Sequence, residues 1–368
     1  MKIVDVKVTL FAWENLEDSA YHGPAIQGKE TNLGLVEIIT DNGFIGEAFL
    51  GSHMKPASID ADNLLRWIKP ILLEKDPRNR EAINVLLHQV SRLTGLRCIG
   101  AVDVALWDLG AKIANMPLHQ FLGGYRTSIR AYASSQRLPS KAAYIEQALG
   151  LKEKGWTAYK IHPPMDPTRD IEVCGAVREA LGNDYRLMLD STWAYDFIDG
   201  MRVGRAIEEM DYYWFEDPLA DNDIHNYVTM REKLKIPIMA TEYPVGSLRD
   251  YPIWITQRAT DFLRGDIPNK GGITTMMKTA HLAEAFGMRY EIHHSGNSLN
   301  NLANLHVSVA LRNCEMFEVL QPDGSHKYGL LKELEIDKDG LIHAPEGPGL
   351  GAQIDYELIK SKTIQVLS

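Results

Sequence analysis

The sequence predicts an α/β protein in which a TIM-like barrel of seven or eight βα units carries a smaller α+β capping domain. From about residue 130 onward, short apolar runs alternate with segments long enough for helices, as in a parallel barrel. Three consecutive runs end in a carboxylate at equal intervals of 26 residues, at Asp190, Glu216 and Glu242. The length of 368 residues suits a barrel with an attached second domain.

The first 125 residues are predicted to form the capping domain. Residues 2–10 alternate between apolar and polar side chains, which is typical of a strand, and two further alternating runs flank the hairpin signal Asp41-Asn42-Gly43. Helices are predicted over 57–75 and 78–94. A later helix has an apolar stripe at spacings of three and four residues, formed by Ile99, Val102, Leu106, Leu109 and Ile113.

Residues 126–320 are predicted to form the barrel, and residues 321–368 to leave it and pack back on the capping domain. Helices are predicted between the strands, for example over 141–154, 168–181 and 273–286, and a last helix over about 299–311. The closing segment is rich in proline and glycine, which argues against a helix there. The predicted strands are 130–134, 157–161, 186–190, 213–216, 237–241, 261–265, 288–292 and 315–319.

The composition of the chain limits the classes of molecule that it can bind and indicates its compartment. The net charge of −10 argues against nucleic acid and anionic membranes, and no apolar run has the length of a membrane span. Cys98, Cys174 and Cys314 lack metal-ligand spacing and indicate a reducing compartment. We therefore expect a cytoplasmic protein that acts on a small molecule. Barrels of this class often self-associate, so a homo-oligomer is expected.

The three equally spaced carboxylates predict a metal site. If their strands are parallel neighbours, Asp190, Glu216 and Glu242 lie together at the C-terminal mouth of the barrel. Like charges so close are costly unless a hard cation neutralises them, which favours Mg²⁺. The alternative interpretation is three unrelated surface acids at strand ends.

Other polar residues stand at the remaining strand ends. Lys160 and His162 are two residues apart and therefore share one strand face; alternatively, Lys160 is an ion-pair partner and His162 a loop residue. Asp266 and His293 follow neighbouring strands, where an Asp can orient an imidazole. Glu318 ends the eighth strand, and its alternative role is a carboxylate that binds Arg.

This arrangement suits removal of a proton next to a carboxylate. A metal would stabilise the negative charge that develops, and a base would stand on each face of the substrate. Two capping-domain loops are expected to close over the mouth, where His22 and His53 are candidate substrate-binding residues, although each is more simply a loop residue.

From about residue 2 to 357, the chain resembles the enolase superfamily and, within it, the mandelate racemase subgroup. The resemblance rests on several motifs together: GAVDVALWDLGAK, Leu189-Asp190, FEDP at 215–218, ATE at 240–242, the segment from Asp266 to Thr274, and the late PGLG. It implies that Asp190, Glu216 and Glu242 bind Mg²⁺. It also implies an Asp266–His293 dyad, with His293 preferred over His294, and Glu318 as the donor to the substrate carboxylate.

The sequence departs from the resembling pattern at two places. The subgroup's Lys-x-Lys is here Lys160-Ile161-His162, so His162 occupies the position of the base and Lys160 is expected to support it. Ser191-Thr192 follows the metal Asp where the second residue is commonly Asn. The first change bears on which residue of this strand acts as the base, and the second can alter a substrate contact.

The favoured activity is that of a lyase, a dehydratase that eliminates water from an acid sugar, because an imidazole such as His293 can act both as base and as acid. Three alternatives stay open: a racemase or epimerase that works by 1,1-proton transfer on a hydroxy or amino acid, a cycloisomerase, and a barrel that binds metal without catalysis.

Overall fold

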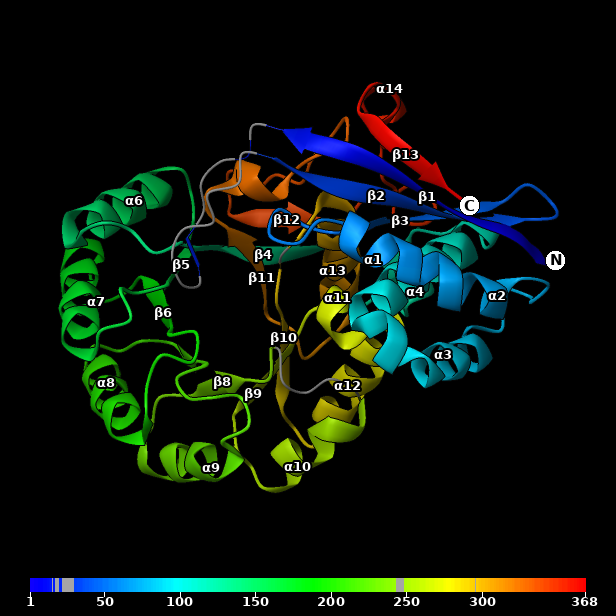
Figure 1. Cartoon of the computed structure of the whole chain (residues 1–368). Coiled ribbons are helices and arrows are strands. Elements are labelled where there is room, and N and C mark those ends of the chain that lie inside the picture. The colour runs from blue at the N-terminus through cyan, green and yellow to red at the C-terminus, as the bar shows by residue number, and fades with distance from the viewer. Residues whose placement is uncertain (15, 17–19, 22–29, 243–247, 295) are drawn as a thin grey trace.

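The structure is a computed structural model that describes residues 1–368 except 15, 17–19, 22–29, 243–247 and 295. His22, a candidate substrate-binding residue, therefore lies outside the described residues. Figure 1 shows the barrel surrounded by its helices, with the capping domain packed against one side.

The predicted (β/α) barrel is confirmed. Within the described residues, eight parallel strands are hydrogen-bonded in sequence order, and the last pairs with the first from Met316↔Arg130 to Leu320↔Ser134. Each strand begins and ends within two residues of its predicted bounds. The strands are β4 (Ser128–Ser134), β5 (Ala158–Ile161), β6 (Arg186–Asp190), β7 (Phe215–Glu216), β8 (Ile238–Ala240), β9 (Phe262–Gly265), β10 (Arg289–Ile292) and β11 (Met316–Leu320).

Helices form the outer layer of the barrel, and polar side chains begin several of them. Ser140, Asp166 and Asp196 each accept a hydrogen bond from a backbone N–H in the first turn of the helix that follows, which stabilises that turn. The helices are α6 (Lys141–Glu153), α7 (Pro167–Leu181), α8 (Phe197–Glu209), α9 (Ile224–Lys233), α10 (Tyr251–Thr256), α11 (Ile267–Lys270), α12 (Ile273–Ala285) and α13 (Ser298–Ala310).

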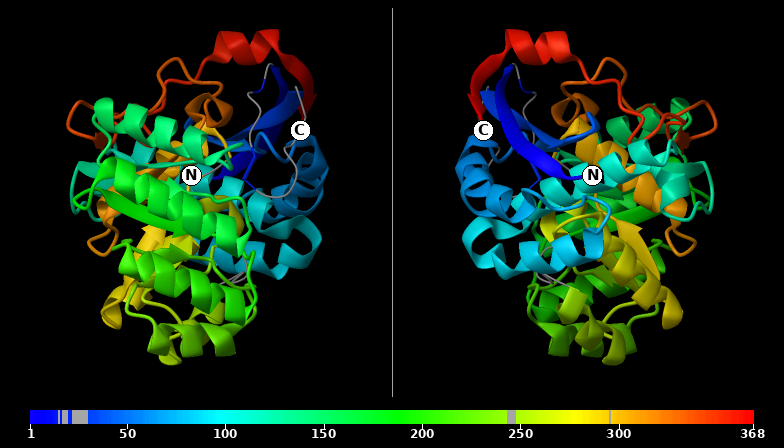
Figure 2. Two further views of the ribbon diagram at one scale, coloured as in Figure 1. Left: turned by 90° about the vertical axis from the view of Figure 1, so that its left-hand side faces the viewer. Right: turned by 90° about the vertical axis from the view of Figure 1, so that its right-hand side faces the viewer.

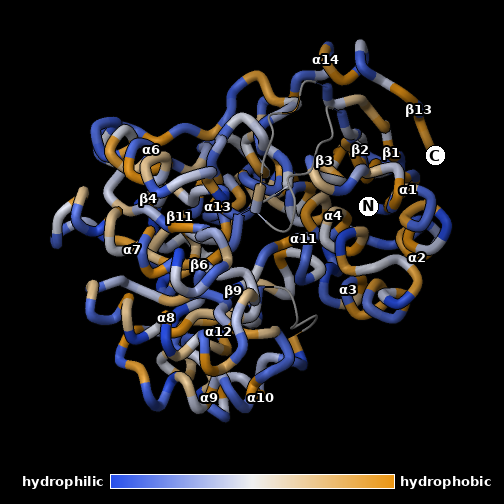
Figure 3. The backbone as a smooth tube through the Cα atoms, turned by 60° about the vertical axis from the view of Figure 1, so that its left-hand side comes forward, coloured by the Kyte–Doolittle hydropathy of each residue, from blue (hydrophilic) through white to orange (hydrophobic). Residues whose placement is uncertain are grey.

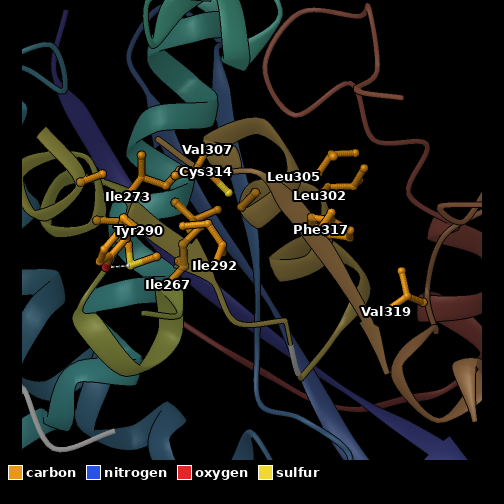
Figure 4. Packing of buried hydrophobic residues seen from close by; sticks show 14 of the residues in the cluster. Ile267, Ile273, Tyr290, Ile292, Leu302, Leu305, Val307, Cys314, Phe317 and Val319 are labelled. Carbon is orange, nitrogen blue, oxygen red and sulfur yellow. Dashed lines mark hydrogen bonds between the residues drawn. The ribbon is translucent and has the colours of Figure 1, made fainter. Parts of the chain in front are cut away.

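Apolar packing holds the helices to the strands. Figure 4 shows side chains of α11, α12 and α13 lying against β10 and β11, among them Ile267, Ile273, Leu305, Ile292 and Phe317. Full burial of one such side chain stabilises the fold by about 1.5–3 kcal/mol. These contacts fix the strand ends from which the polar side chains of the mouth project.

The barrel interior has an apolar floor and a polar mouth. Toward the N-terminal ends of the strands, seven buried side chains pack against each other: Tyr132, Ala158, Met188, Trp214, Met239, Phe262 and Met316. Because this layer fills the lower half, the charged residues gather at the opposite, C-terminal end, where barrels of this kind carry their sites.

An antiparallel sheet and a set of helices form the capping domain, as predicted. The sheet order is β13-β1-β2-β3, with β1 (Ile3–Glu14), β2 (Glu30–Thr40) and β3 (Ile45–Leu50) joined in part by the predicted hairpin. The helices are α1 (Ser58–Asn63), α2 (Lys69–Leu72), α3 (Arg80–Gln89), α4 (Ser91–Ile113) and α5 (Leu118–Phe121), with a π-helical turn at Leu64–Ile68 between the first two.

Two predicted helices of this domain differ in detail. The helix expected over 57–75 contains the π-helical turn and stops at Leu72. The helix expected over 78–94 ends at Gln89, because Val90 leaves helical geometry and α4 begins directly after it. Gly95, at φ +73°, breaks the first turn of α4 and thus separates the predicted stripe from the residues before it.

The C-terminal segment returns to the capping domain. Its last strand, β13 (Thr363–Leu367), pairs antiparallel with β1, and Val8 lies opposite Leu367. Before that, β12 (Leu341–His343) pairs with β4 of the barrel, and α14 (Tyr356–Ser361) leads to the last strand. Figure 2 shows α14 and β13 at the edge of the capping sheet.

Figure 3 shows hydrophobic and hydrophilic residues intermixed along the helices. In the part of the chain that the structure describes, no helix is both long and apolar enough to cross a membrane.

Two of the sequence motifs meet where the capping domain contacts the barrel. Asp103 of α4 accepts hydrogen bonds from Thr274 N at 2.8 Å and from Thr274 Oγ1 at 2.7 Å. Trp107 Nε1 donates to the same hydroxyl at 2.8 Å. The preceding Gly272 has φ +112°, and a Cβ there would lie 2.3 Å from Asp103 Oδ2. Glycine at 272 therefore permits the close approach of the two domains.

We expect Gly272→Ala to destabilise the protein more than Gly123→Ala does. Gly123 has a similar φ of +119° but open space around it, so both changes strain the backbone and only the first forces Asp103 away. The expected difference in the free energy of unfolding, measured by urea denaturation, is about 1–3 kcal/mol. Equal destabilisation by the two changes would show that this contact is not tightly packed.

Candidate active site

The three predicted metal ligands lie together in the barrel mouth. Asp190 ends β6, Glu216 ends β7, and Glu242 lies two residues beyond β8. One oxygen of each lies within 4.8 Å of the others, and the three residues are at most 4% exposed. Oxygen ligands so close and so buried match the donor set that a hard divalent cation requires.

The equal spacing in the sequence does not correspond to equal register in the sheet. Asp190 pairs with Glu216, but Glu216 pairs with Met239, which packs in the barrel floor. Simple alternation from Met239 would point Thr241 inward and Glu242 outward. Instead Thr241 has φ +88°, a strained conformation for a β-branched residue, and the chain turns Glu242 into the mouth.

Lys160 is an ion-pair partner of the carboxylates, which was the alternative interpretation of this residue. Its Nζ lies 3.0 Å from Asp190 Oδ2, 2.9 Å from Glu216 Oε2 and 2.8 Å from Glu318 Oε1, and the side chain is fully buried. Burial and Arg264 lower the pKa of Lys160, but the three carboxylates together raise it well above its ordinary value. Lys160 is therefore a fixed positive charge.

Arg264 is a buried residue of the carboxylate cluster that was not expected from the sequence. It is fully buried inside β9, and its Nε lies 2.6 Å from Glu216 Oε1 and 3.6 Å from Glu242 Oε2. Its Nη2 pairs with Glu318. Binding an arginine was the alternative role predicted for Glu318. The available signal was the spacing of Arg264 and Asp266, since residues two apart on a strand share a face.

The cluster carries more negative than positive charge. Four carboxylates contact Lys160 or Arg264, so two negative charges remain without a cation among these groups. Burial raises the pKa of Glu216 to about 7, even though Arg264 and Lys160 act to lower it. In Glu318, by contrast, the same two cations outweigh burial and hold the pKa well below its usual range.

His162 is oriented by the strand next to it. Its Nδ1 lies 2.6 Å from the Ser135 carbonyl oxygen, which can only accept, so Nδ1 donates its proton. In neutral His162 the Nε2 atom therefore carries the free lone pair, and it lies 3.1 Å from Asp190 Oδ2. The ring also lies edge-on to Tyr21, with their centroids 5.0 Å apart.

Asp266 and His293 form the predicted pair. His293 Nδ1 lies 3.0 Å from Asp266 Oδ2. The other carboxylate oxygen, Asp266 Oδ1, accepts a hydrogen bond from Asn304 Nδ2 at 3.1 Å. The carboxylate thus fixes the ring, and Nε2 lies 3.2 Å from Glu242 Oε1. Burial lowers the pKa of His293, but Glu242 and Asp266 raise it to about 9.

His294 points away from this site. Its Nδ1 contacts the backbone carbonyl of Glu318, and its ring lines a separate cavity behind β11 beside Trp156 and Phe317. Of the two adjacent histidines, His293 lines the cavity above the carboxylates and His294 does not.

A cavity of about 340 Å³ lies above the carboxylates and between the two domains. His53, the other candidate from the capping loops, lines it, whereas Lys160, Arg264 and Glu318 lie beneath it. Its walls include, from the barrel side, His162, Asp190, Thr192, Glu242, Asn269 and His293, and from other segments, Tyr21, Phe49, Ser52, His53, Lys55, Arg97 and His326.

Comparison with known proteins identifies the family. Residues 143–358 match the family described as enolase C-terminal domain-like, and residues 23–123 match the mandelate racemase/muconate lactonizing enzyme N-terminal domain. The chain belongs to the mandelate racemase subgroup of the enolase superfamily. The two matches cover both the capping domain and most of the barrel of this superfamily member.

Curated relatives match along nearly the whole length. The chain is 28% identical to arabinonate dehydratase of Saccharolobus solfataricus, covering 96% of each chain. It is also 28% identical to D-galactarolactone cycloisomerase of Agrobacterium fabrum, covering 98% of each. Among solved structures, D-glucarate dehydratase from Agrobacterium tumefaciens complexed with magnesium is 30% identical, with a TM-score of 0.88 over 99% of this chain and 100% of that chain. These relatives carry out different reactions.

We expect Arg264→Met to destabilise the protein strongly. The change leaves buried carboxylates without one of their two cations, which typically costs about 3–5 kcal/mol. Arg312→Met is the matched control, because Arg312 pairs with Glu284 at 2.7 Å on the surface, where such pairs contribute about 0–1 kcal/mol. Urea denaturation of both variants measures the difference. Similar stabilities would contradict the role of Arg264 as a required counter-charge.

Proposed function

We propose that Asp190, Glu216 and Glu242 hold a Mg²⁺ ion. Their oxygen atoms lie within 4.8 Å of one another, and the cluster around them retains two unbalanced negative charges. The similar D-glucarate dehydratase binds magnesium, which supports this choice of metal. Bound there, Mg²⁺ would supply positive charge for the carboxylate of a substrate.

We infer that the protein is a dehydratase that eliminates water from an acid sugar. The observation that carries this inference is the placement of two imidazoles, His162 and His293, in one cavity with the carboxylate triad. They come from β5 and β10, and the three carboxylates come from the intervening β6 to β8 region. One imidazole can therefore take a proton while the other gives one. Relatives named as acid-sugar dehydratases support this reaction.

His162 is the proposed base. Its Nδ1 proton is held by the Ser135 carbonyl, so Nε2 is free to accept the proton from the carbon next to the substrate carboxylate. Lys160 is engaged by three carboxylates below the cavity, and its role is to stabilise the negative charge that develops there. In this assignment the lysine supports the reaction and does not move a proton.

His293 is the proposed acid. Asp266 holds its Nδ1, so Nε2 can give a proton to the hydroxyl group on the next carbon. The C–H bond and then the C–O bond break, and the hydroxyl leaves as water with the proton from His293. The resulting enol then becomes a keto acid: its carbon next to the enol carbon gains a proton, and the enol hydroxyl loses one to solvent.

The same two imidazoles support a second candidate reaction. If His162 and His293 stand on opposite faces of the bound acid, one can remove the α-proton and the other can return a proton to the other face, which is epimerisation. A third candidate reaction is cycloisomerisation, because one relative is a D-galactarolactone cycloisomerase.

One screen distinguishes the three reactions: acid sugars, hydroxy acids and amino acids are incubated in deuterated water and followed by proton NMR. Loss of water supports dehydration, and inversion of configuration without it contradicts dehydration.

We expect Glu216→Gln to weaken Mg²⁺ binding without weakening the fold. The change removes a metal ligand and one of the excess negative charges, so the affinity should fall at least about 100-fold while the melting temperature stays level or rises. Calorimetry measures the affinity. Asp170→Asn is the control, because Asp170 is a buried carboxylate that bonds Tyr195 on the outer layer. Unchanged Mg²⁺ affinity in Glu216→Gln would contradict the metal assignment.

We expect His293→Asn to stop turnover but to retain exchange of the α-proton with deuterium, because His162 still removes and returns that proton. His294→Asn is the matched control, since the adjacent ring lies outside the cavity and turnover should persist. Proton NMR in deuterated water measures exchange and turnover together. Normal turnover in His293→Asn, or its loss only in His294→Asn, would contradict the assigned acid.

A further inference from the structure

We propose that His53 and His326 form a subsite that binds an uncharged hydroxyl group at the far end of a monocarboxylic acid sugar. The inference rests on the proposed function, because it names the substrate class of the same cavity. It assigns a specificity role to His326, which the sequence analysis did not single out.

The two imidazoles come from distant segments and meet in the cavity. His53 lies in the turn between β3 and α1, and His326 ends the short 3-10 helix that follows β11. Their ring centroids are 4.4 Å apart and their planes are nearly perpendicular. Both segments are held by α13: Asn301 Nδ2 donates to the His326 carbonyl at 3.0 Å, and Asn297 Nδ2 donates to the Gly51 carbonyl at 2.8 Å.

All four ring nitrogens of this pair lack a hydrogen-bond partner among the residues that the structure describes, and all four are buried. His326 is only 1% exposed. Buried polar atoms are costly unless they are hydrogen-bonded, so unpaired atoms in a cavity wall indicate that a ligand or water completes them. The other imidazoles of this cavity, His162 and His293, each have a protein oxygen within 3.2 Å of both ring nitrogens.

The charge state of the pair favours a hydroxyl group. Burial lowers the pKa of His53 to about 4 and that of His326 well below its usual value, so both rings are neutral at neutral pH. A neutral imidazole offers one donor and one acceptor, and a hydroxyl group can complement both. A carboxylate only accepts, and it would leave the acceptor nitrogens unpaired.

Two cationic residues also line this cavity, but neither is free to define the subsite. Arg97 Nη2 lies 2.6 Å from Asp60 Oδ2, and Lys55 lies 3.7 Å from the other oxygen of the same carboxylate. The Lys55 side chain is 43% exposed, so solvent screens its charge. A second carboxylate on the substrate would therefore meet a shared and partly screened charge.

The pair lies at a suitable place for the far end of the substrate. The ring of Tyr21 contacts both His162 and His326, with centroids 5.0 Å and 6.0 Å away, respectively. The Tyr21 hydroxyl donates to the Gln321 carbonyl, which fixes the ring. A substrate whose carboxylate lies at Asp190 and Glu242 can thus extend past Tyr21 and place its last hydroxyl at His53 and His326.

The test measures binding, so that it is independent of turnover. Five- and six-carbon aldonates, their terminal-deoxy analogues and the matching dicarboxylic acids are titrated calorimetrically into the Mg²⁺-loaded protein. We expect at least one aldonate to bind about 10- to 100-fold more tightly than its terminal-deoxy analogue, because the analogue leaves buried nitrogens unpaired. In His326→Phe and in His53→Phe this ratio should fall toward one, and His326→Gln should restore part of it.

His119→Phe is the matched control. His119 is also buried, and neither of its ring nitrogens has a hydrogen-bond partner in the described part of the chain. It stacks on His306 outside this cavity, so the ratio should stay at the wild-type value. Thermal melting shows whether each variant folds. If His326→Phe does not fold, the ratio of aldonate to terminal-deoxy affinity is measured in His53→Phe and His326→Gln instead.

The outcomes separate the subsite from the reaction. An unchanged ratio in the folded variants, or tighter binding of the dicarboxylic acids by the wild type, overturns the subsite and leaves dehydration standing. A ratio that collapses in the variants, together with no loss of water in the NMR screen, supports the subsite and overturns dehydration. Absence of binding by every acid in the set overturns both.

Discussion

The buried salt cluster in the barrel mouth is the interaction on which the rest of this structure depends. Each of its charges would be costly to bury alone, and each contacts at least one charge of opposite sign, with two cations shared among four carboxylates. The charged residues come from strands around most of the barrel. Their charges are therefore paired only when these strands have closed into the barrel. Its members are Lys160, Asp190, Glu216, Glu242, Arg264 and Glu318.

The same cluster determines which groups line the cavity above it. Lys160 and Arg264 lie below the carboxylates, so Asp190, Glu242 and the two imidazoles face the cavity. The capping domain covers that cavity through contacts that leave little freedom, such as the Asp103–Thr274 bonds and the Asn297 bond to Gly51. The cavity walls are consequently shared between the two domains, whereas the buried salt cluster beneath belongs to the barrel.

Most of the barrel could be predicted from the sequence because buried strands and outer helices have different periodicities. The break at Val90 could not, because neighbouring helical patterns merge when no strong terminating signal separates them. Arg264 was missed for a related reason: a charged residue inside an apolar strand is interpretable only once its partners are known. His326 lies in a segment without periodicity, so no sequence signal assigned it to the cavity.

The sequence by itself determined which strand ends carry polar groups, because alternation and spacing are local properties of the chain. It could also place Asp266 near His293, since neighbouring parallel strands end at the same edge of the barrel. Only the tertiary structure decided how Glu242 reaches the mouth, because its side chain depends on the conformation of Thr241 and not on the 26-residue interval. The pairing of His53 with His326 was likewise decided by domain packing, which brings together segments that share no local pattern.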